Sequence, residues 1–256
     1  MTITLHPSTP PRPAVDDSIV PEGARWELLD GVRLMTPPAY EPHATHHSDL
    51  HYILRAHVAE GFFVAIDMAT RTTEDTNFAP DVSIYPAARD PLTGGRQFEA
   101  LAFEIVSEQS MAVPTRKAIT LLQRGVRRVF AIKLRARSQS LLEFHLDTNA
   151  WITLAPGTRI TDPTLALPIT VNDLLRAAQA DGAVARALLA REVPEVMAPI
   201  IEQRHRAELA EARADLAEAR AEQERVRAEQ ERERAERAEQ ELAILKARLA
   251  RNDSNT

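Results

Sequence analysis

The chain has 256 residues and no cysteine, and its 31 lysines and arginines against 37 acidic residues give a formal net charge of −6 at pH 7. A domain commonly contains about 100–200 residues, so this length allows one sizeable core with an appended segment. The lack of cysteine excludes disulfide frameworks, thiolate zinc sites and cysteine nucleophiles. Neither a signal peptide nor the run of roughly 18 apolar residues of a membrane span is recognisable, so we expect a cytoplasmic protein.

The N-terminal part of the chain gives weak structural signals. Residues 1–20 are rich in proline and lack periodicity, so we expect a disordered lead-in. The sequence WELLDG (26–31) predicts a short helical turn that ends in a turn at Asp30 and Gly31. The sequence VRLM (32–35) that follows predicts a strand.

Stronger signals follow for helices and strands. Apolar side chains at helical spacing predict a helix over residues 42–60, which Gly61 is placed to end, and a second helix is predicted over residues 114–124 with Gly125 beyond it. The strand-like runs are FFVAIDM (62–68), DVSIY (81–85), LAFEIV (101–106), VFAIKL (129–134), LLEFHL (141–146) and WITL (151–154). This order predicts an α/β domain over residues 21–180, with a mixed β-sheet flanked by helices.

The C-terminal part, residues 181–256, is predicted to be a helical, charged tail. Glutamate and arginine alternate on an alanine background from about residue 195 to 251, and no glycine or proline follows Pro199. A seven-residue spacing relates Leu209, Leu216, Gln223 and Gln230. The two glutamines make the middle of this seam more polar than is usual for a coiled coil. The sequence leaves two alternatives open, a weak dimeric coiled coil that makes the protein a homodimer and a solvated single helix.

Two acidic residues stand in strand-like runs where a carboxylate needs a partner. Asp81 follows a proline at the start of one run, and Glu104 lies in the middle of LAFEIV. A buried carboxylate is costly unless a cation, a metal or hydrogen-bond donors satisfy it. On neighbouring strands the two could hold one divalent ion, since Mg²⁺ binds through one or two carboxylates, waters and phosphate oxygens. Lys117 is one of only three lysines in a chain whose other cations are arginines, and an ammonium acts as a compact point charge.

The ordered set of WELLDG, FAPDVSIY, FEIVS, a helix lysine and QRGVRRVFAI resembles the Uma-two type restriction endonucleases of the PD-(D/E)XK nuclease superfamily. The resemblance covers residues 20–180. Asp81, Glu104 and Lys117 match the three charged positions of the family, and Glu27 matches an acid often found in its first helix. The superfamily's usual lysine two residues after the glutamate is Val106 here, and Lys117 on the helix would replace it.

This resemblance implies a restriction-endonuclease-like core and a divalent-metal-dependent endonuclease that hydrolyses phosphodiester bonds in DNA. Asp81 and Glu104 would bind Mg²⁺ or Mn²⁺, with Glu27 acting through a water or as a base. Lys117 would orient the nucleophile or neutralise the scissile phosphate. Contacts to the nucleic-acid backbone, which are independent of sequence, are expected from Arg116, Arg124, Arg127 and Arg128.

Two other interpretations remain. His47 and His51 share a helix face at i,i+4 and could seed a zinc site, but there is no HExxH motif, and we expect a polar helix start with exposed histidines instead. His43 is expected near the nuclease site, where the family often places a histidine. The alternative function is an inactive nuclease-like scaffold that acts as an interaction protein through its helical tail.

Overall fold

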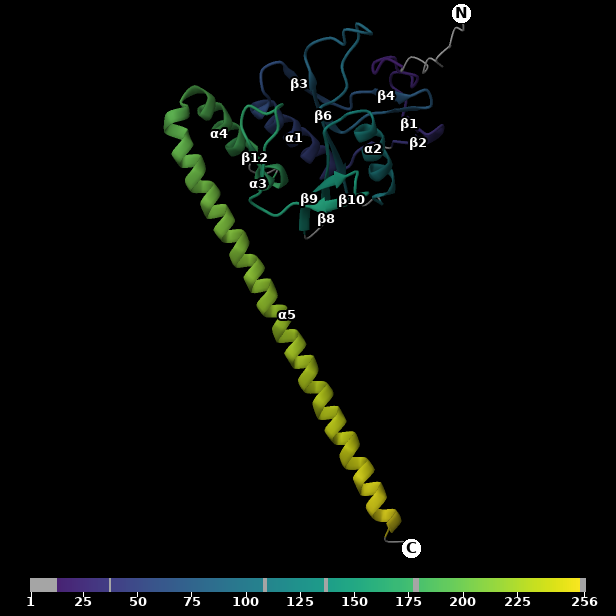
Figure 1. Ribbon diagram of the computed structural model, residues 1–256, viewed down its shortest axis with the longest axis vertical. Helices are drawn as coiled ribbons and strands as arrows, with labels where there is room; N and C mark the ends of the chain where they lie inside the picture. The colour runs from purple at the N-terminus through teal and green to yellow at the C-terminus, as the bar shows by residue number, and fades with distance from the viewer. Residues whose placement is uncertain (1–12, 37, 108–109, 136–137, 177–179, 254–256) are drawn as a thin grey trace, which may run out of the picture. The chain divides into compact units, whose positions relative to one another are not determined.

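The structure, a computed structural model, describes residues 13–36, 38–107, 110–135, 138–176 and 180–253 (Figure 1). The chain divides into two compact units, Met1–Gln203 and Arg204–Thr256. The strands are β1 (Trp26–Leu29), β2 (Val32–Met35), β3 (Phe62–Ile66), β4 (Thr70–Thr73), β5 (Thr76–Phe78), β6 (Val82–Pro86), β7 (Leu101–Val106), β8 (Arg128–Arg135), β9 (Ser138–His145), β10 (Ala150–Thr153), β11 (Arg159–Ile160) and β12 (Ile169–Thr170). The helices are α1 (His43–His57), α2 (Ala112–Gln123), α3 (Val171–Leu175), α4 (Ala180–Glu192) and α5 (Pro194–Asp253).

A six-stranded mixed sheet with the order β10-β9-β8-β7-β6-β3 forms the centre of the first unit. β7 and β8 run parallel, and all other neighbours in this sheet are antiparallel. The six strand-like runs of the sequence supply its six strands, which confirms the predicted α/β class. All six residues of β7 are buried, as expected for a strand with neighbours on both sides and elements packed on both faces.

The two faces of the central sheet bury separate apolar clusters. Leu101, Phe103 and Ile105 point to the face that α1, α3 and α4 cover. Ala102 points to the other face, where Ala118 and Leu121 of α2 pack against the sheet. Because side chains alternate along a strand, Glu104 shares the α2 face with Ala102. The sheet therefore presents a carboxylate directly to α2.

A second, four-stranded antiparallel sheet has the order β2-β1-β5-β4. β1 contains the sequence WELL, so the predicted helical turn at this position is wrong, and Glu27 lies on a strand. The antiparallel β1–β2 hairpin turns at Asp30 and Gly31, which both have positive φ angles of 50° and 74°. The turn was predicted correctly, and pairing with β2 and β5 gives this segment its extended conformation.

Part of the predicted lead-in is folded onto this second sheet. Residues 1–12 lie outside the described residues, but Val15 is only 3% exposed, and its carbonyl accepts a hydrogen bond from the Arg71 N–H at 2.9 Å. Asn77 Oδ1 accepts hydrogen bonds from Ser18 Oγ and from the Ile19 N–H, both at 2.8 Å. The expectation of disorder therefore does not hold for residues 13–20. Hydrogen bonds, which a sequence without periodicity does not reveal, hold this segment on the second sheet.

The second unit consists of the α5 residues from Arg204 onward. Arg225 pairs with Glu222 at 2.9 Å and Arg227 with Glu231 at 3.3 Å, which are the i,i+3 and i,i+4 spacings of helix-surface ion pairs. Leu216 and Val226 are 53% and 43% exposed. In the part of the chain that the structure describes, no helix combines the length and apolar character needed to cross a membrane.

Candidate active site

The pairing of β6 with β7 brings two of the predicted site residues together. The antiparallel register places Val82 opposite Phe103, so Asp81 and Glu104 follow at the same end of the strand pair and on the same face. Asp81 Oδ2 accepts a hydrogen bond from the Ile105 N–H at 2.5 Å. This bond anchors the Asp81 carboxylate to the strand that carries Glu104.

Lys117 of α2 lies between carboxylates from both sheets. Its Nζ atom is 2.9 Å from Glu27 Oε2 and 3.5 Å from Glu104 Oε2, and it donates a hydrogen bond to the Ala79 carbonyl at 3.1 Å. Glu27 Oε1 also accepts the Ala79 N–H at 2.8 Å. Lys117 and Glu104 are only 6% and 4% exposed. The three N–H donors of the ammonium thus face three acceptors in a site shielded from water.

Burial determines the protonation of this cluster. Loss of hydration raises the pKa of Glu104 to about 8, which Lys117 opposes and Asp81 and Glu27 reinforce. Burial lowers the pKa of Lys117, but the charges of Glu104 and Glu27 outweigh it, so its pKa lies above the ordinary lysine value. Glu104 Oε1 is buried without a hydrogen-bond partner among the described residues. The cluster therefore holds a charged ammonium beside a carboxyl group whose Oε1 atom has no hydrogen-bond partner among the described residues.

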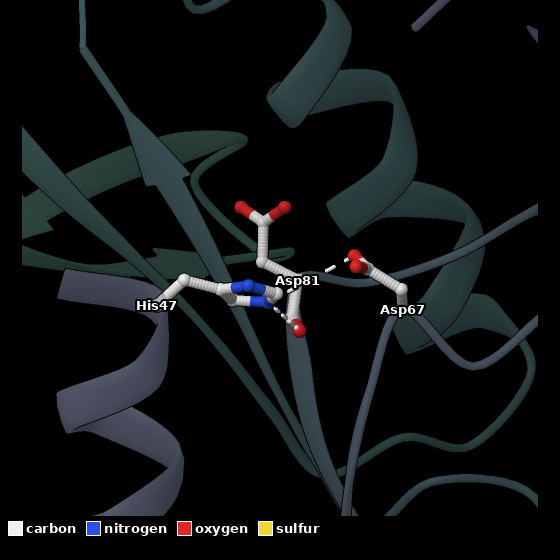
Figure 2. A group of neighbouring side chains, drawn as sticks. All are labelled: His47, Asp67 and Asp81. Carbon is white, nitrogen blue, oxygen red and sulfur yellow. Dashed lines mark hydrogen bonds and ion pairs between the residues drawn. The ribbon is translucent and has the colours of Figure 1, made fainter. Parts of the chain in front are cut away.

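Asp81 faces α1 and the end of β3 through a second group of side chains. His43 Nε2 is 3.8 Å from Asp81 Oδ1, and His47 Nε2 is 3.8 Å from Asp67 Oδ1. The His47 Nε2–H also donates a short hydrogen bond to the Asp81 carbonyl. His47, Asp67 and Asp81 each offer a ligand atom within 4.8 Å of the others (Figure 2).

The sequence prediction for the histidines was only partly correct. His43 lies near Asp81 as expected, and His46 is 3% exposed, so the helix start is not a row of exposed histidines. His47 faces Asp67 and Asp81, and no metal-binding group of the described residues joins it to His51. The involvement of Asp67 was missed. Its only sequence signal is an acid that directly follows a strand, and the β3–β6 pairing brings it beside Asp81.

The four arginines predicted to contact nucleic acid all have partners within the chain. Arg116 pairs with Asp30, Arg127 pairs with Asp162 at 2.6 Å, Arg128 binds both oxygens of Glu143 at 2.6 and 2.9 Å, and Arg124 lies over the Phe98 ring at 4.7 Å. The side chains of Arg116 and Arg127 stay 46% and 44% exposed, whereas the Arg128 side chain is 24% exposed and bridges two strands. Exposure thus leaves Arg116 and Arg127 better placed for solvent-side contacts than Arg128.

Comparison with known proteins shows to which family the chain belongs. No curated protein matches the chain significantly. A family model described as "Uma2: Putative restriction endonuclease" matches residues 14–177. This match covers more than half of the chain and includes the four-stranded and six-stranded sheets, α1 and α2, so it contains every residue of the candidate site. The chain therefore belongs to the Uma2 family, and its mixed sheet with flanking helices is a restriction-endonuclease-like core.

Proposed function

We propose that the protein is a divalent-metal-dependent endonuclease that hydrolyses phosphodiester bonds in DNA. The observation that carries this proposal is the buried cluster of Lys117 and Glu104 beside Asp81. A buried ammonium and a buried carboxyl group with an unliganded oxygen are costly in a purely structural core. At a site for an anionic substrate and a cation, the Lys117 ammonium would contact the substrate and the Glu104 oxygen would bind the cation.

The residues present fit a Mg²⁺ or Mn²⁺ ion. Asp81 and Glu104 offer carboxylate oxygens, which hard divalent ions prefer, and Glu104 Oε1 has no competing hydrogen bond within the described part of the chain. When bound, such an ion lowers the pKa of a coordinated water and offsets charge that develops on the phosphate. The pKa of about 8 favours a protonated Glu104 without a cation, and a nearby divalent ion would favour its carboxylate form.

Lys117 and Glu27 have different tasks in this proposal. Glu27 receives the shortest contact from Lys117 Nζ and also binds the Ala79 N–H, so it positions the ammonium. The contact from Nζ to Glu104 is the longest, at 3.5 Å. The N–H group of Lys117 that faces Glu104 can therefore donate a hydrogen bond to a phosphate oxygen of the substrate instead. Glu27 and the Ala79 carbonyl hold the ammonium in place meanwhile. Arg116 and Arg127 would add sequence-independent contacts to the nucleic-acid backbone.

The test is cleavage of plasmid DNA by the purified full chain in Mg²⁺ or Mn²⁺. Asp81→Asn and Glu104→Gln keep the side-chain shapes and remove the charges, so we expect either change to lower the rate by at least about a hundredfold. Glu60→Gln, at an exposed carboxylate just after α1, is the matched control and should cleave like the wild type. Cleavage at the wild-type rate by both Asp81→Asn and Glu104→Gln would refute the proposal.

A further inference from the structure

His47, Asp67 and Asp81 combine an imidazole with two carboxylates at one end of the central sheet. Figure 2 shows His47, which comes from α1, next to both aspartates. Asp67 directly follows β3, and Asp81 directly precedes β6. Their ligand atoms lie within 4.8 Å of one another, and no second group of this kind occurs among the residues that the structure describes. Three separate elements therefore supply one potential ligand set.

The backbone fixes the two aspartates relative to each other. Asp67 adopts a left-handed conformation with a φ of 47°, and its N–H donates a hydrogen bond to the Asp81 carbonyl at 3.2 Å. The same carbonyl accepts the hydrogen bond from His47 Nε2. One peptide oxygen thus gathers all three residues. A cation that approaches the group would take Nε2 from this hydrogen bond, because a histidine binds metal only through a deprotonated nitrogen.

The carboxylates of Asp67 and Asp81 repel each other, because their ligand atoms lie within 4.8 Å. Partial loss of hydration raises the pKa of Asp67; His47 opposes this shift and Asp81 adds to it. The Asp67 side chain is nevertheless 70% exposed, so an ion from solvent can reach it. A divalent cation would relieve the repulsion between the aspartates.

The imidazole decides which cations suit the group. Mg²⁺ binds oxygen ligands and holds its waters tightly, whereas first-row transition cations also accept imidazole nitrogen. We propose that His47, Asp67 and Asp81 form a cation site that prefers Mn²⁺ to Mg²⁺. This inference rests on the proposed nuclease function and deepens it, because it names the class of ion that binds at Asp81 and assigns His47 and Asp67 as further ligands of that aspartate's cation.

The experiment measures binding of Mn²⁺ alone to the full chain without DNA, by loss of the electron paramagnetic resonance signal of free Mn²⁺, with Mg²⁺ as competitor. We expect Mn²⁺ to bind at least about tenfold more tightly than Mg²⁺. Asp67→Asn and His47→Gln should each weaken Mn²⁺ binding by about tenfold or more and change the Mg²⁺ affinity less. Asp147→Asn, in the exposed turn between β9 and β10, is the matched control and should bind Mn²⁺ like the wild type.

Two results would overturn the inference. One is equal affinity of the wild type for Mn²⁺ and Mg²⁺, and the other is unchanged Mn²⁺ binding in both Asp67→Asn and His47→Gln. Because Asp67 is exposed, its variant should fold even if His47→Gln does not. Failure here is distinguishable from failure of the nuclease proposal, since that proposal is decided by DNA cleavage in Asp81→Asn and Glu104→Gln.

Discussion

At the scale of single residues, Lys117 holds the charges of the site together. It contacts Glu27 and Glu104 within a region where all three side chains are at most 13% exposed. At pH 9, above the pKa of about 8 of Glu104, we expect Lys117→Met to lower the free energy of unfolding by about 3–5 kcal/mol, because it leaves two buried carboxylates without their cation. Urea unfolding followed by circular dichroism measures this change.

A double variant separates charge from packing at the same position. Adding Glu104→Gln to Lys117→Met removes one of the stranded carboxylates, so the double variant should be more stable than Lys117→Met alone. If the double variant loses as much stability as the sum of the losses in Lys117→Met and Glu104→Gln, the buried ion pair is not the cause.

His46 predicts how stability depends on pH. Burial lowers its pKa, opposed by a hydrogen bond with the Leu174 backbone and reinforced by His43. As pH falls below about 6.5, the unfolded chain takes up a proton that the folded chain refuses, so the free energy of unfolding decreases. His46→Gln removes this titration and should give a flatter dependence between pH 7 and 5. Thermal or urea unfolding in EDTA across this range measures it.

The comparison for His46 uses a histidine near the surface. His145→Gln, at the end of β9, removes a histidine that is not buried and should retain the steep pH dependence of the wild type. Equal slopes for wild type and His46→Gln would show that His46 does not exclude the proton in the folded state.

The sequence located some of these side chains and missed others for physical reasons. Asp81 and Glu104 were recognisable because acids are rare in buried strand-like runs, and Lys117 because lysine is rare in this chain. The roles proposed for them stay predictions. Asp67 was not recognisable, because its partners come from strand register and from α1, which a single sequence does not specify.

At the scale of elements, Asn77 of β5 connects the N-terminal segment to the second sheet. The Asn77 side chain is buried, and its Oδ1 atom accepts hydrogen bonds from Ser18, Ile19 and Val20. Asn77→Ala leaves these donors without their acceptor, so we expect a loss of about 1–3 kcal/mol in stability. Faster hydrogen exchange at the Ile19 and Val20 amides would show that the segment has been released.

Hydrogen exchange at amides of the central sheet is the control for this prediction. Amides of β7 and β8 lie in the central sheet and should exchange as slowly in Asn77→Ala as in the wild type, apart from the shared loss of global stability. Unchanged exchange at Ile19 and Val20 would contradict the anchoring role of Asn77.

Elements with strong apolar patterns were predictable, and short polar ones were not. All six strands of the central sheet come from apolar runs, and α1 and α2 begin and end within a few residues of their predicted bounds. β4 and β5 have the sequences TRTT and TNF, in which pairing and burial outweigh weak local preference. β1 was assigned to the wrong structure because WELL fits a helical turn as well as a strand until its partners β2 and β5 are known.

At the scale of the whole molecule, the first unit contains the four-stranded and six-stranded sheets and every residue of the candidate site. The ion pair of Arg159 with Glu202 at 3.2 Å lies near its C-terminal limit. A chain that ends after Gln203 should therefore fold with a melting temperature within about 5 °C of the full chain. Under the proposed function it should also keep divalent-dependent DNA cleavage. Loss of cleavage in a folded truncated chain would instead assign a role in activity to the second unit.

The second unit is the segment for which we propose homodimer formation through α5. The full chain should then show twice the monomer mass by light scattering, and the chain ending after Gln203 the mass of one monomer. A monomeric full chain would favour the solvated single helix. Partner capture by the tail in a protein without cleavage would favour the scaffold function.

Anomalous diffraction from crystals soaked in Mn²⁺ tests the central claim most directly, because it locates the cation relative to Asp81 and Glu104. We predict a manganese peak within coordinating distance of the Asp81 carboxylate. Absence of manganese from both carboxylates, at a concentration that saturates the protein in solution, would contradict this account.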